Sequence, residues 1–352
     1  MKYRIAVIPG DGIGKEVVPQ GVRVLDAAAR RFGFELDWQY FDWSCRYYAD
    51  NGRMMPANGI DILRGFDAIF LGAVGDPSVP DHISLWGLLI PIRREFQQYA
   101  NVRPVRLMPG VHPMLADCRP GDIDFVIVRE NTEGEYSTRG RIEHEGMDDE
   151  AAIQESVFSR RGTDRVMRYA FELALRRRNH VTSATKSDGL TITMPFWERR
   201  FKAISAQYPQ VGTSQYHIDS LAAHMIRHPD RFDVVVGSNL FGDILSGLGP
   251  ACAGTVAIAP SANLNPEKNY PSMFEPVHGS APDIAGKGIA NPIGQIWAGA
   301  MMLDHLGQKE AAAAVEAAME RALADGVRTA DMGGSVPTDE VGGIIMELTS
   351  SQ

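Results

Sequence analysis

The sequence predicts an α/β fold built on a parallel or mixed sheet that helices cover on both faces. Short apolar stretches alternate with amphipathic ones along the chain, which is the pattern of strands that alternate with helices. The first apolar stretch, residues 4–8, passes through a glycine-rich turn into a helical pattern at residues 15–31. A chain of 352 residues also exceeds the usual span of one domain, so we expect two domains or one large α/β unit.

Each element follows from its local pattern of apolar residues and turn signals. Strands are expected at 4–8, 35–41, 68–71, 102–107, 124–128, 180–184 and 233–237. Helices are expected at 15–31, 163–178, 189–208, 218–228, 293–306 and 310–324. The polar segment 137–154 should leave the core, either as a solvated loop or as an arm that reaches another subunit. The proline-rich stretch 259–292 is predicted to be a long structured loop, and such loops are usually functional.

Composition excludes several kinds of partner. With 44 acidic and 35 basic residues the net charge is −9, which argues against nucleic acid or an anionic membrane as the main partner. Cys45, Cys118 and Cys252 lie far apart, without metal-ligand spacing or an even count, so a reducing cytoplasm is expected. No apolar run approaches the ~18 residues of a spanning helix, and we expect an unanchored cytoplasmic protein.

The glycine turn at Gly10, Gly12 and Gly14 has two interpretations. Backbone amides at a helix N-terminus can hold a pyrophosphate, as in dinucleotide-binding turns. The spacing here differs from that fingerprint, however, and Asp11 would place a negative charge beside the phosphates. A tight turn that binds nothing is about equally compatible with the pattern.

Three arginines lie in apolar sequence where ligands of α/β sheets gather, near strand ends. Arg129 follows a predicted strand, and Arg93 and Arg103 flank a crossing from helix to strand. The planar guanidinium group suits bidentate recognition of carboxylates, so the three arginines predict a small di- or tricarboxylate ligand. The alternative is that each is an ordinary surface ion-pair residue.

Two aspartates are candidate metal ligands. Asp219 shares a helical face with Ala222, Ala223 and Ile226, and a carboxylate on a buried stripe needs a partner. Mg²⁺ or Mn²⁺ would serve, with Asp243 as a second oxygen ligand. The alternatives are a buried salt bridge for Asp219 and a helix-dipole role for Asp243.

Several motifs, spread over nearly the whole chain, resemble those of the β-decarboxylating dehydrogenases of hydroxy acids, the isocitrate/isopropylmalate dehydrogenase-like family. They are Ile8-Pro-Gly-Asp-Gly-Ile-Gly-Lys-Glu16, Asn101-Val-Arg-Pro104, Val128-Arg-Glu-Asn131, Asn239-Leu-Phe-Gly-Asp-Ile-Leu245 and the segment 275–292. The motifs Asp81-His-Ile-Ser-Leu-Trp86 and Ala259-Pro-Ser-Ala-Asn-Leu-Asn-Pro266 resemble the tartrate dehydrogenase and D-malate dehydrogenase branch.

The resemblance implies a two-domain, non-Rossmann fold and a homodimer. Residues 1–100 plus 256–352 would form a discontinuous cofactor-binding domain. Residues 101–255 would form the substrate, metal and dimerisation domain, with residues 137–154 as an arm that clasps the partner. The active site would be shared between the two subunits.

The implied activity is NAD- and metal-dependent oxidation, with β-decarboxylation, of tartrate and/or D-malate, the latter to pyruvate and CO₂. Arg93, Arg103 and Arg129 would hold the substrate carboxylates. Lys186, from the partner subunit, would remove the hydroxyl proton, and Tyr136 would protonate the product carbon. The alternatives are a 3-isopropylmalate or isocitrate dehydrogenase, or a catalytically impaired paralogue that binds nucleotide or carboxylate.

The resemblance also implies a cofactor and ion set. NAD is expected because Asp283 would repel the 2′-phosphate of NADP, and Mn²⁺ or Mg²⁺ is expected at Asp219 and Asp243. K⁺ is a further ion common in the branch. The implied cofactor-binding residues are Ile13, His278, Gly279, Ser280, Ala281, Asp283, Ile284 and Asn291.

Two positions depart from the family pattern. Gly247 stands where the family has another aspartate near the metal, so we expect weaker binding of the divalent ion. Asp188 stands where an asparagine is usual. An anion beside Lys186 should raise the pKa of this lysine and make it a poorer base near neutrality.

Overall fold

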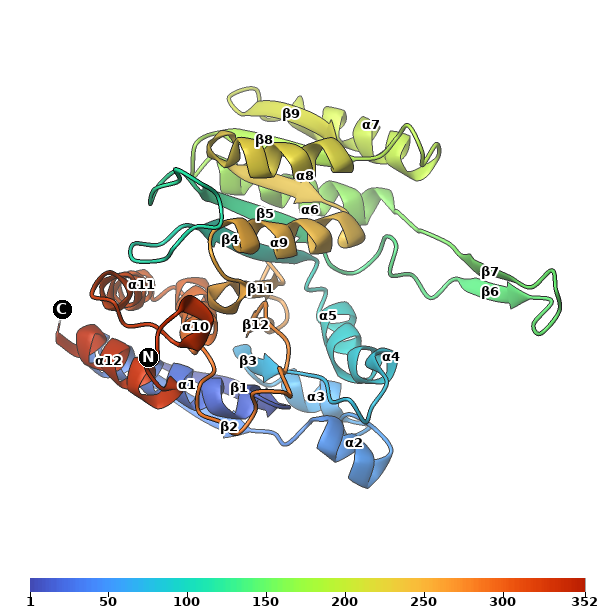
Figure 1. Ribbon diagram of the computed structural model, residues 1–352. Coiled ribbons are helices and arrows are strands. Elements are labelled where there is room, and N and C mark those ends of the chain that lie inside the picture. Colours follow the sequence, from blue (N-terminus) through green and yellow to red (C-terminus); the bar gives the residue numbers. More distant parts are fainter. Residues whose placement is uncertain (352) are drawn as a thin grey trace.

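The computed structural model, which describes residues 1–351, has one large mixed sheet with helices on both faces (Figure 1). Its strands are β1 (Lys2–Gly10), β2 (Glu35–Tyr40), β3 (Ala68–Ala73), β4 (Ala100–Arg106), β5 (Asp124–Glu130), β8 (His180–Thr185), β9 (Gly212–His217), β10 (Val234–Gly237), β11 (Pro260–Leu264) and β12 (Ser272–Pro276). The strand order is β2-β1-β3-β12-β11-β4-β5-β10-β8-β9. The predicted α/β class is confirmed.

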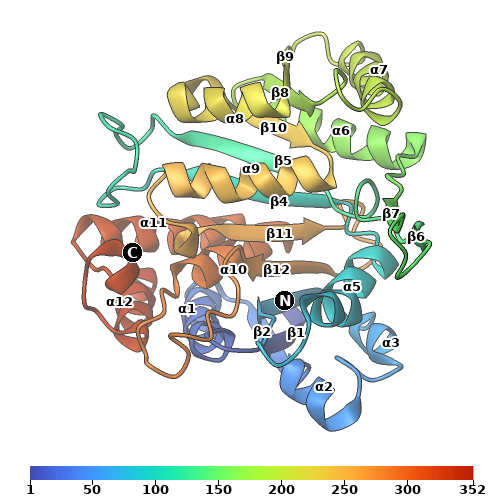
Figure 2. The ribbon, with the colours of Figure 1, turned by 45° about the vertical axis from the view of Figure 1, so that its right-hand side comes forward.

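The helices lie on both faces of this sheet (Figure 2). They are α1 (Gly14–Phe32), α2 (Cys45–Asn51), α3 (Gly59–Leu63), α4 (Asp81–Ser84), α5 (Ile90–Glu95), α6 (Arg160–Ala174), α7 (Thr193–Ser205), α8 (Ile218–Arg227), α9 (Asn239–Cys252), α10 (Ile293–His305), α11 (Lys309–Ala324) and α12 (Thr338–Ser351). A π-helical turn, Leu85–Leu89, joins α4 to α5. The expected helix at 163–178 begins earlier, because the Ser159 hydroxyl caps α6 by accepting from Gly162 N, and it ends earlier, at Ala174.

The first strand and helix form as their patterns predict. Residues Ile5 to Ile8 of β1 are fully buried, and α1 buries Val17, Val18 and Leu25. The helix ends at Gly33, whose φ of 75° is in the left-handed region that glycine adopts without steric cost.

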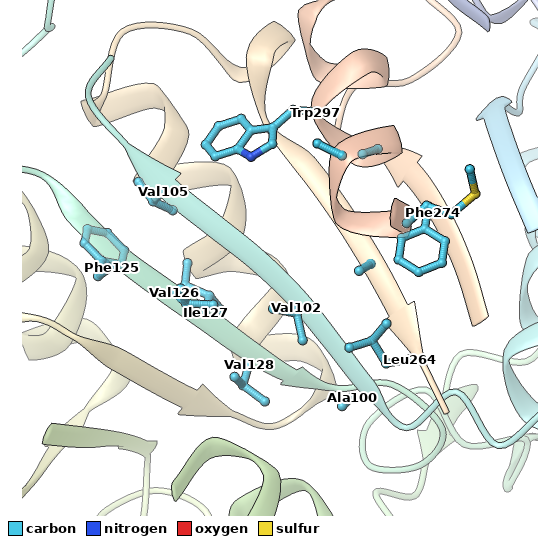
Figure 3. Packing of buried hydrophobic residues seen from close by; sticks show 14 of the residues in the cluster. Ala100, Val102, Val105, Phe125, Val126, Ile127, Val128, Leu264, Phe274 and Trp297 are labelled. Carbon is cyan, nitrogen blue, oxygen red and sulfur yellow. The ribbon is translucent and has the colours of Figure 1, made fainter. Parts of the chain in front are cut away.

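Alternate residues of the central strands enter two separate apolar clusters. Ala68 and Phe70 of β3 belong to the larger cluster, whereas Ile69 and Leu71 belong to a second one on the other face. Figure 3 shows the larger cluster, where apolar residues of β4, β5, β11 and β12 lie beside Trp297 of α10. Both faces of the sheet are therefore covered in its middle, and the central strand β3 is apolar and buried at every residue rather than alternating.

The expectation of a loop over residues 259–292 is wrong for its first half. The stretch contains β11 and β12, two fully buried strands in the middle of the sheet. Prolines do not prevent this because they lie at the strand ends: Pro260 is the first residue of β11 and Pro276 the last of β12. Only the part after Pro276 is a long loop.

The polar segment 137–154 leaves the core, as expected. It forms an antiparallel hairpin of β6 (Gly140–Glu143) and β7 (Ala151–Gln154), which projects from the body of the molecule (Figure 1). Ile142 and Met147 of this hairpin are 55% and 66% exposed in the single chain.

Within residues 1–351, none of the helices combines the length and the apolar character that crossing a membrane requires.

Candidate active site

The three predicted arginines converge near the middle of the sheet. Arg93 lies on α5, Arg103 on β4 and Arg129 on β5, and they are 6%, 8% and 2% exposed. In the antiparallel register of β4 and β5, Arg129 lies opposite Asn101, two residues from Arg103, so both arginines share one face of the sheet. Burial to this degree excludes the interpretation as surface ion-pair residues.

Asp243 is the carboxylate at the centre of this cluster. It accepts hydrogen bonds from Arg129, from Arg103 Nη1 at 3.3 Å and from the Tyr136 hydroxyl at 2.9 Å. Burial by itself would raise the pKa of Asp243, but the positive charges of Arg129 and Arg103 outweigh it and lower this pKa. The carboxylate therefore stays ionised, and it neutralises charge on the arginines rather than interacting with the helix dipole alone.

Side chains on α9 accept hydrogen bonds from the guanidinium groups of two of the arginines. Asn239 Oδ1 accepts from Arg129 Nε at 3.0 Å and Nη2 at 2.7 Å, and Ser246 Oγ accepts from Arg103 Nη1 at 2.6 Å. A Cβ at Gly242 would lie 2.6 Å from the Arg129 Cβ, so only glycine allows this approach of helix to strand. One face of α9 thus fixes both guanidinium groups.

Tyr136 is held beside the cluster as a neutral phenol. Arg94 Nη2 donates to the Tyr136 carbonyl at 2.6 Å, and the Arg129 guanidinium lies 5.4 Å from the centre of the tyrosine ring. Burial, followed by the charge of Asp243, raises the pKa of Tyr136. The hydroxyl therefore retains a proton that it can donate.

Beneath the arginines lies a buried polar network that sequence reasoning missed. Glu275 on β12 pairs with Arg93 Nη2 at 2.8 Å and accepts from Asn263 Nδ2 at 2.8 Å. Asn263 Oδ1 accepts in turn from Asn101 and Asn131, each at 2.9 Å. The sequence does contain a signal for this network, because its asparagines and Glu275 interrupt otherwise apolar strands. The sequence alone assigns no role to them.

Lys186 lies in a second cluster of charges. Its ammonium group is 3.1 Å from Asp188 and 3.2 Å from Asp219. The hydrogen bond to Asp188, followed by that to Asp219, raises the pKa of Lys186. This direction is the one expected from an anion at position 188.

Asp219 does not lie on a buried stripe, which corrects the premise of the sequence argument. Its side chain is 66% exposed and Ile226 is 44% exposed. The side of α8 that is buried carries Leu221 and Met225 instead, both fully covered. Asp219 therefore shares its helix face with residues that the single chain leaves open to solvent.

The structure does not bring the two predicted metal ligands together in one chain. In residues 1–351, no hydrogen bond or ion pair joins Lys186 or Asp219 to Asp243 or to the three arginines. The same part of the chain has no group of three or more His, Cys, Asp or Glu side chains that could hold a metal ion. The candidate site is thus presented in two separate parts.

The glycine turn is built against the loop that follows β12. Ile13 N donates to the Ser280 carbonyl at 2.8 Å, and a Cβ at Gly12 would lie 2.0 Å from that oxygen. Asp11 is 4% exposed and accepts from Cys45 N at 3.0 Å and Gly75 N at 3.1 Å. The charge of Asp11 is therefore used inside the fold, where it joins two loops.

The predicted cofactor residues gather beside this turn. A cavity of about 490 Å³ is lined by residues 74–77 and 79–81 after β3 and by Gly279, Ser280 and Pro282. Burial lowers the pKa of His278, whose Nε2 is buried without a partner in the described chain. Asn291 donates to Asp331 at 3.1 Å. The other predicted residues lie nearby: Ile13 and Ile284 pack in one small apolar cluster with Ala281, and Asp283 is exposed on the loop.

The fold and the site define an α/β dehydrogenase class. The chain matches the isocitrate/isopropylmalate dehydrogenase family over residues 4–345, and it belongs to this family. The resemblance drawn from the sequence motifs is confirmed.

Individual proteins are similar to this chain over almost its whole length. The chain is 59% identical to the D-malate dehydrogenase [decarboxylating] of Escherichia coli (strain K12), over 98% of each chain. It is also 59% identical to the tartrate dehydrogenase/decarboxylase of Pseudomonas putida, over 98% of this chain and 97% of the relative. The crystal structure of isocitrate dehydrogenase from Methylococcus capsulatus superposes with a TM-score of 0.89 at 34% identity, over 99% of this chain and all of the other.

Proposed function

We propose that the protein oxidises a small 2-hydroxy dicarboxylate, tartrate and/or D-malate, with NAD⁺ and a divalent cation, and that it decarboxylates D-malate to pyruvate and CO₂. The observation that carries this proposal is the buried cluster of three arginines around Asp243 and Tyr136 in a member of this family. The 59% identity to relatives named for D-malate and tartrate, against 34% for an isocitrate enzyme, favours these substrates over isocitrate.

The arginines would bind and orient the substrate. Arg93, Arg103 and Arg129 carry three positive charges, whereas Asp243 and Glu275 supply two negative ones. The surplus of one positive charge, already desolvated by the fold, favours an anionic ligand. Because the guanidinium groups are fixed by side chains of α9, β11 and β12, they need little reorganisation when the ligand binds.

Two groups would move protons. Lys186 would first lose its ammonium proton to solvent, and the neutral amine would then take the C2 hydroxyl proton. Tyr136 would donate its phenolic proton to the carbon from which CO₂ departs. The raised pKa of Tyr136 suits a donor, whereas the raised pKa of Lys186 opposes its role as a base. Proton removal by Lys186 should therefore be the pH-limited step.

The residues present fit the expected cofactor and ion. The unpartnered His278 Nε2 and the cavity beside Ser280 suit a nucleotide, and the exposed carboxylate of Asp283 favours NAD over NADP. The oxygen donors Asp219 and Asp243 suit Mn²⁺ or Mg²⁺. When bound, the two groups would supply a hydride acceptor and a Lewis acid at the C2 oxygen. We propose K⁺ as a further ion that the enzyme uses.

We propose that the two charge clusters meet in a homodimer. Lys186 and Asp219 contact each other and would enter the partner's site together, so each site would hold Asp243 from one subunit and Asp219 from the other. Apolar side chains exposed on α8 and α9, namely Ile226, Leu240 and Ile244, together with the β6–β7 arm, are a suitable surface for this contact.

The two proposed domains correspond to the two ends of the sheet. Strands from residues 1–100 plus 256–352 occupy one end of the sheet, β2-β1-β3-β12-β11, and strands from residues 101–255 occupy the other. We propose that the first part binds the cofactor and that the second binds the substrate, the metal and the partner.

The decisive experiment follows NADH absorbance after the protein is mixed with NAD⁺, Mn²⁺ and K⁺. D-malate, each tartrate stereoisomer, isocitrate and 3-isopropylmalate are added in turn, with and without EDTA. We expect NADH with D-malate or a tartrate, and no NADH once EDTA removes the metal. Turnover of only isocitrate or 3-isopropylmalate would reject the substrate proposal. Silence across the whole set would favour the impaired paralogue.

A further inference from the structure

A cavity of about 730 Å³ lies between α6 and the turn that joins β11 to β12, apart from the residues of the candidate active site. Its lining contains four arginines and two carboxylates, together with two tyrosines and several amides. The charged members are Arg160, Arg161, Arg165, Arg168, Asp164 and Glu267. A volume of this size is in the range of small-molecule sites, which is roughly 300 to 1,000 Å³.

The arginines lie where the helix itself disfavours them. Arg160 and Arg161 occupy the first turn of α6, which has no acidic residue, although the N-terminus of a helix carries a partial positive charge. Arg161, Arg165 and Arg168 follow at helical spacing and so share one face of the helix. The sequence thus concentrates cations at the end of a 15-residue helix that is already electropositive.

The carboxylates in the lining offset only part of this charge. Asp164 pairs with Arg160 at 3.6 Å and is also held by Arg200 through two hydrogen bonds, of 2.6 and 2.9 Å. Glu267 accepts from the Tyr99 hydroxyl at 2.7 Å. In the described chain, Arg161 and Arg168 make no hydrogen bond or ion pair with any other side chain.

Arg165 adds an unfilled donor. Its terminal nitrogens donate to Gln97 Oε1 at 2.9 Å and to Thr132 Oγ1 at 2.7 Å, and its guanidinium lies 4.3 Å from the centre of the Tyr99 ring. Its Nε is buried and has no hydrogen-bond partner in the described chain. A second cavity, of about 430 Å³, shares Gln97, Arg161 and Arg165 with the first and adds Arg94.

We propose that this arginine pocket, defined by Arg161, Arg165 and Arg168, is a second binding site, for a small anion that carries two or more phosphate or carboxylate groups. Guanidinium groups with free donors bind such groups in bidentate fashion. The ligand is compact rather than aromatic, because Tyr270 already has Phe96 6.0 Å away on one side and Arg64 5.3 Å away. The site goes beyond the proposed function, which does not use these residues.

The test is isothermal titration of the full-length protein, without divalent metal, with pyrophosphate as the phosphate probe and tricarballylate as the carboxylate probe. We expect at least one probe to bind, and binding to weaken as ionic strength rises. The double variant Arg161→Glu/Arg168→Glu should bind at least about tenfold more weakly, a loss of about 1.4 kcal/mol, since both substitutions remove charge-assisted contacts. The stronger probe identifies phosphate or carboxylate as the ligand group.

Two control variants separate this site from the others. Arg176→Glu makes the same kind of charge change just beyond the end of α6, outside the pocket, and should leave binding unchanged. Arg129→Met alters the active-site cluster. If binding is lost in Arg129→Met but kept in the double variant, the anion occupies the active site and the proposal is wrong. Absence of binding by both probes, with the dehydrogenase activity intact, would also overturn it.

Discussion

At the scale of single residues, the neighbours of the two proposed metal ligands decide how strongly a cation can bind. Asp243 already neutralises two arginines, and Asp219 is engaged by Lys186. Each carboxylate therefore has less negative charge to offer a metal than an isolated one would. An aspartate at position 247, where the family pattern has one, would supply a carboxylate that is not already paired with an arginine or a lysine.

Gly247→Asp should tighten binding of the divalent ion. Nothing lies within 4 Å of a Cβ built at Gly247, so the new side chain meets no steric obstacle. We expect the Mn²⁺ concentration for half-maximal activity to fall on the order of tenfold. The control is Gly247→Ala, which should stabilise α9 by about 1 kcal/mol without changing the metal requirement. Equal metal dependence in all three proteins would contradict a ligand role at this position.

Asp188→Asn should shift the pH profile of kcat. The hydrogen bond to Asp188 is the first cause of the raised pKa of Lys186, so its weakening lowers this pKa. A base acts only when it is deprotonated, and the ascending limb of the profile should therefore move to lower pH. Steady-state rates measured from about pH 6 to about pH 11, a range that includes the ordinary lysine pKa of about 10.4, test this. An unmoved limb would show that Lys186 does not set it.

At the scale of elements, the strands and helices with a clear apolar period were predictable, whereas β11 and β12 were not. Their prolines indicated a loop, and Asn263 and Glu275 interrupt their apolar pattern. Those polar residues belong in a strand only because Asn101, Asn131 and Arg93, distant in sequence, supply their partners. No local pattern contains that information.

The site was predictable to a similar degree. The arginines and Asp243 could be found because charged residues at the ends of apolar strands are unusual. The exposure of Asp219 could not be predicted, because helical spacing groups residues on a face without showing whether that face turns toward the sheet or away from it.

Asn263→Ala tests whether the buried network holds the sheet together. Removal of this side chain leaves the amides of Asn101 and Asn131 and one oxygen of Glu275 with fewer partners. We expect the free energy of unfolding to fall by about 2 to 4 kcal/mol, since each unsatisfied buried group costs about 1 to 3 kcal/mol. Urea titration measures this, and Asn269→Ala, an exposed asparagine, should have little effect.

At the scale of the whole molecule, stability should depend on the protonation of Glu130. Burial raises the pKa of this carboxyl to about 7, from an ordinary value of 4.5. Between these two values the unfolded chain releases the proton while the folded protein keeps it. The contribution of Glu130 is therefore fully present below about pH 4.5 and is lost as the pH rises through 7.

Glu130→Gln should remove this loss. The stability of the variant minus that of the unchanged protein should rise by on the order of 1 to 3 kcal/mol from pH 5 to pH 8. His305, whose pKa burial lowers to about 4, acts in the opposite direction over an overlapping range, so only the difference between the two proteins isolates Glu130. Urea midpoints at several pH values provide it. The exposed Glu340→Gln should leave the pH dependence unaltered.

The strand order also constrains how the protein emerges during synthesis. β3 has β1 on one side, but its other neighbour, β12, is translated only after β4, β5, β8, β9 and β10. Until β12 is made, β3 in the nascent N-terminal segment therefore has one unpaired edge, and all its residues are of the kind that the fold buries. The strands of the middle of the chain, β4, β5, β10, β8 and β9, can pair with one another before that. On the ribosome, the end made first would be the last to acquire its native structure.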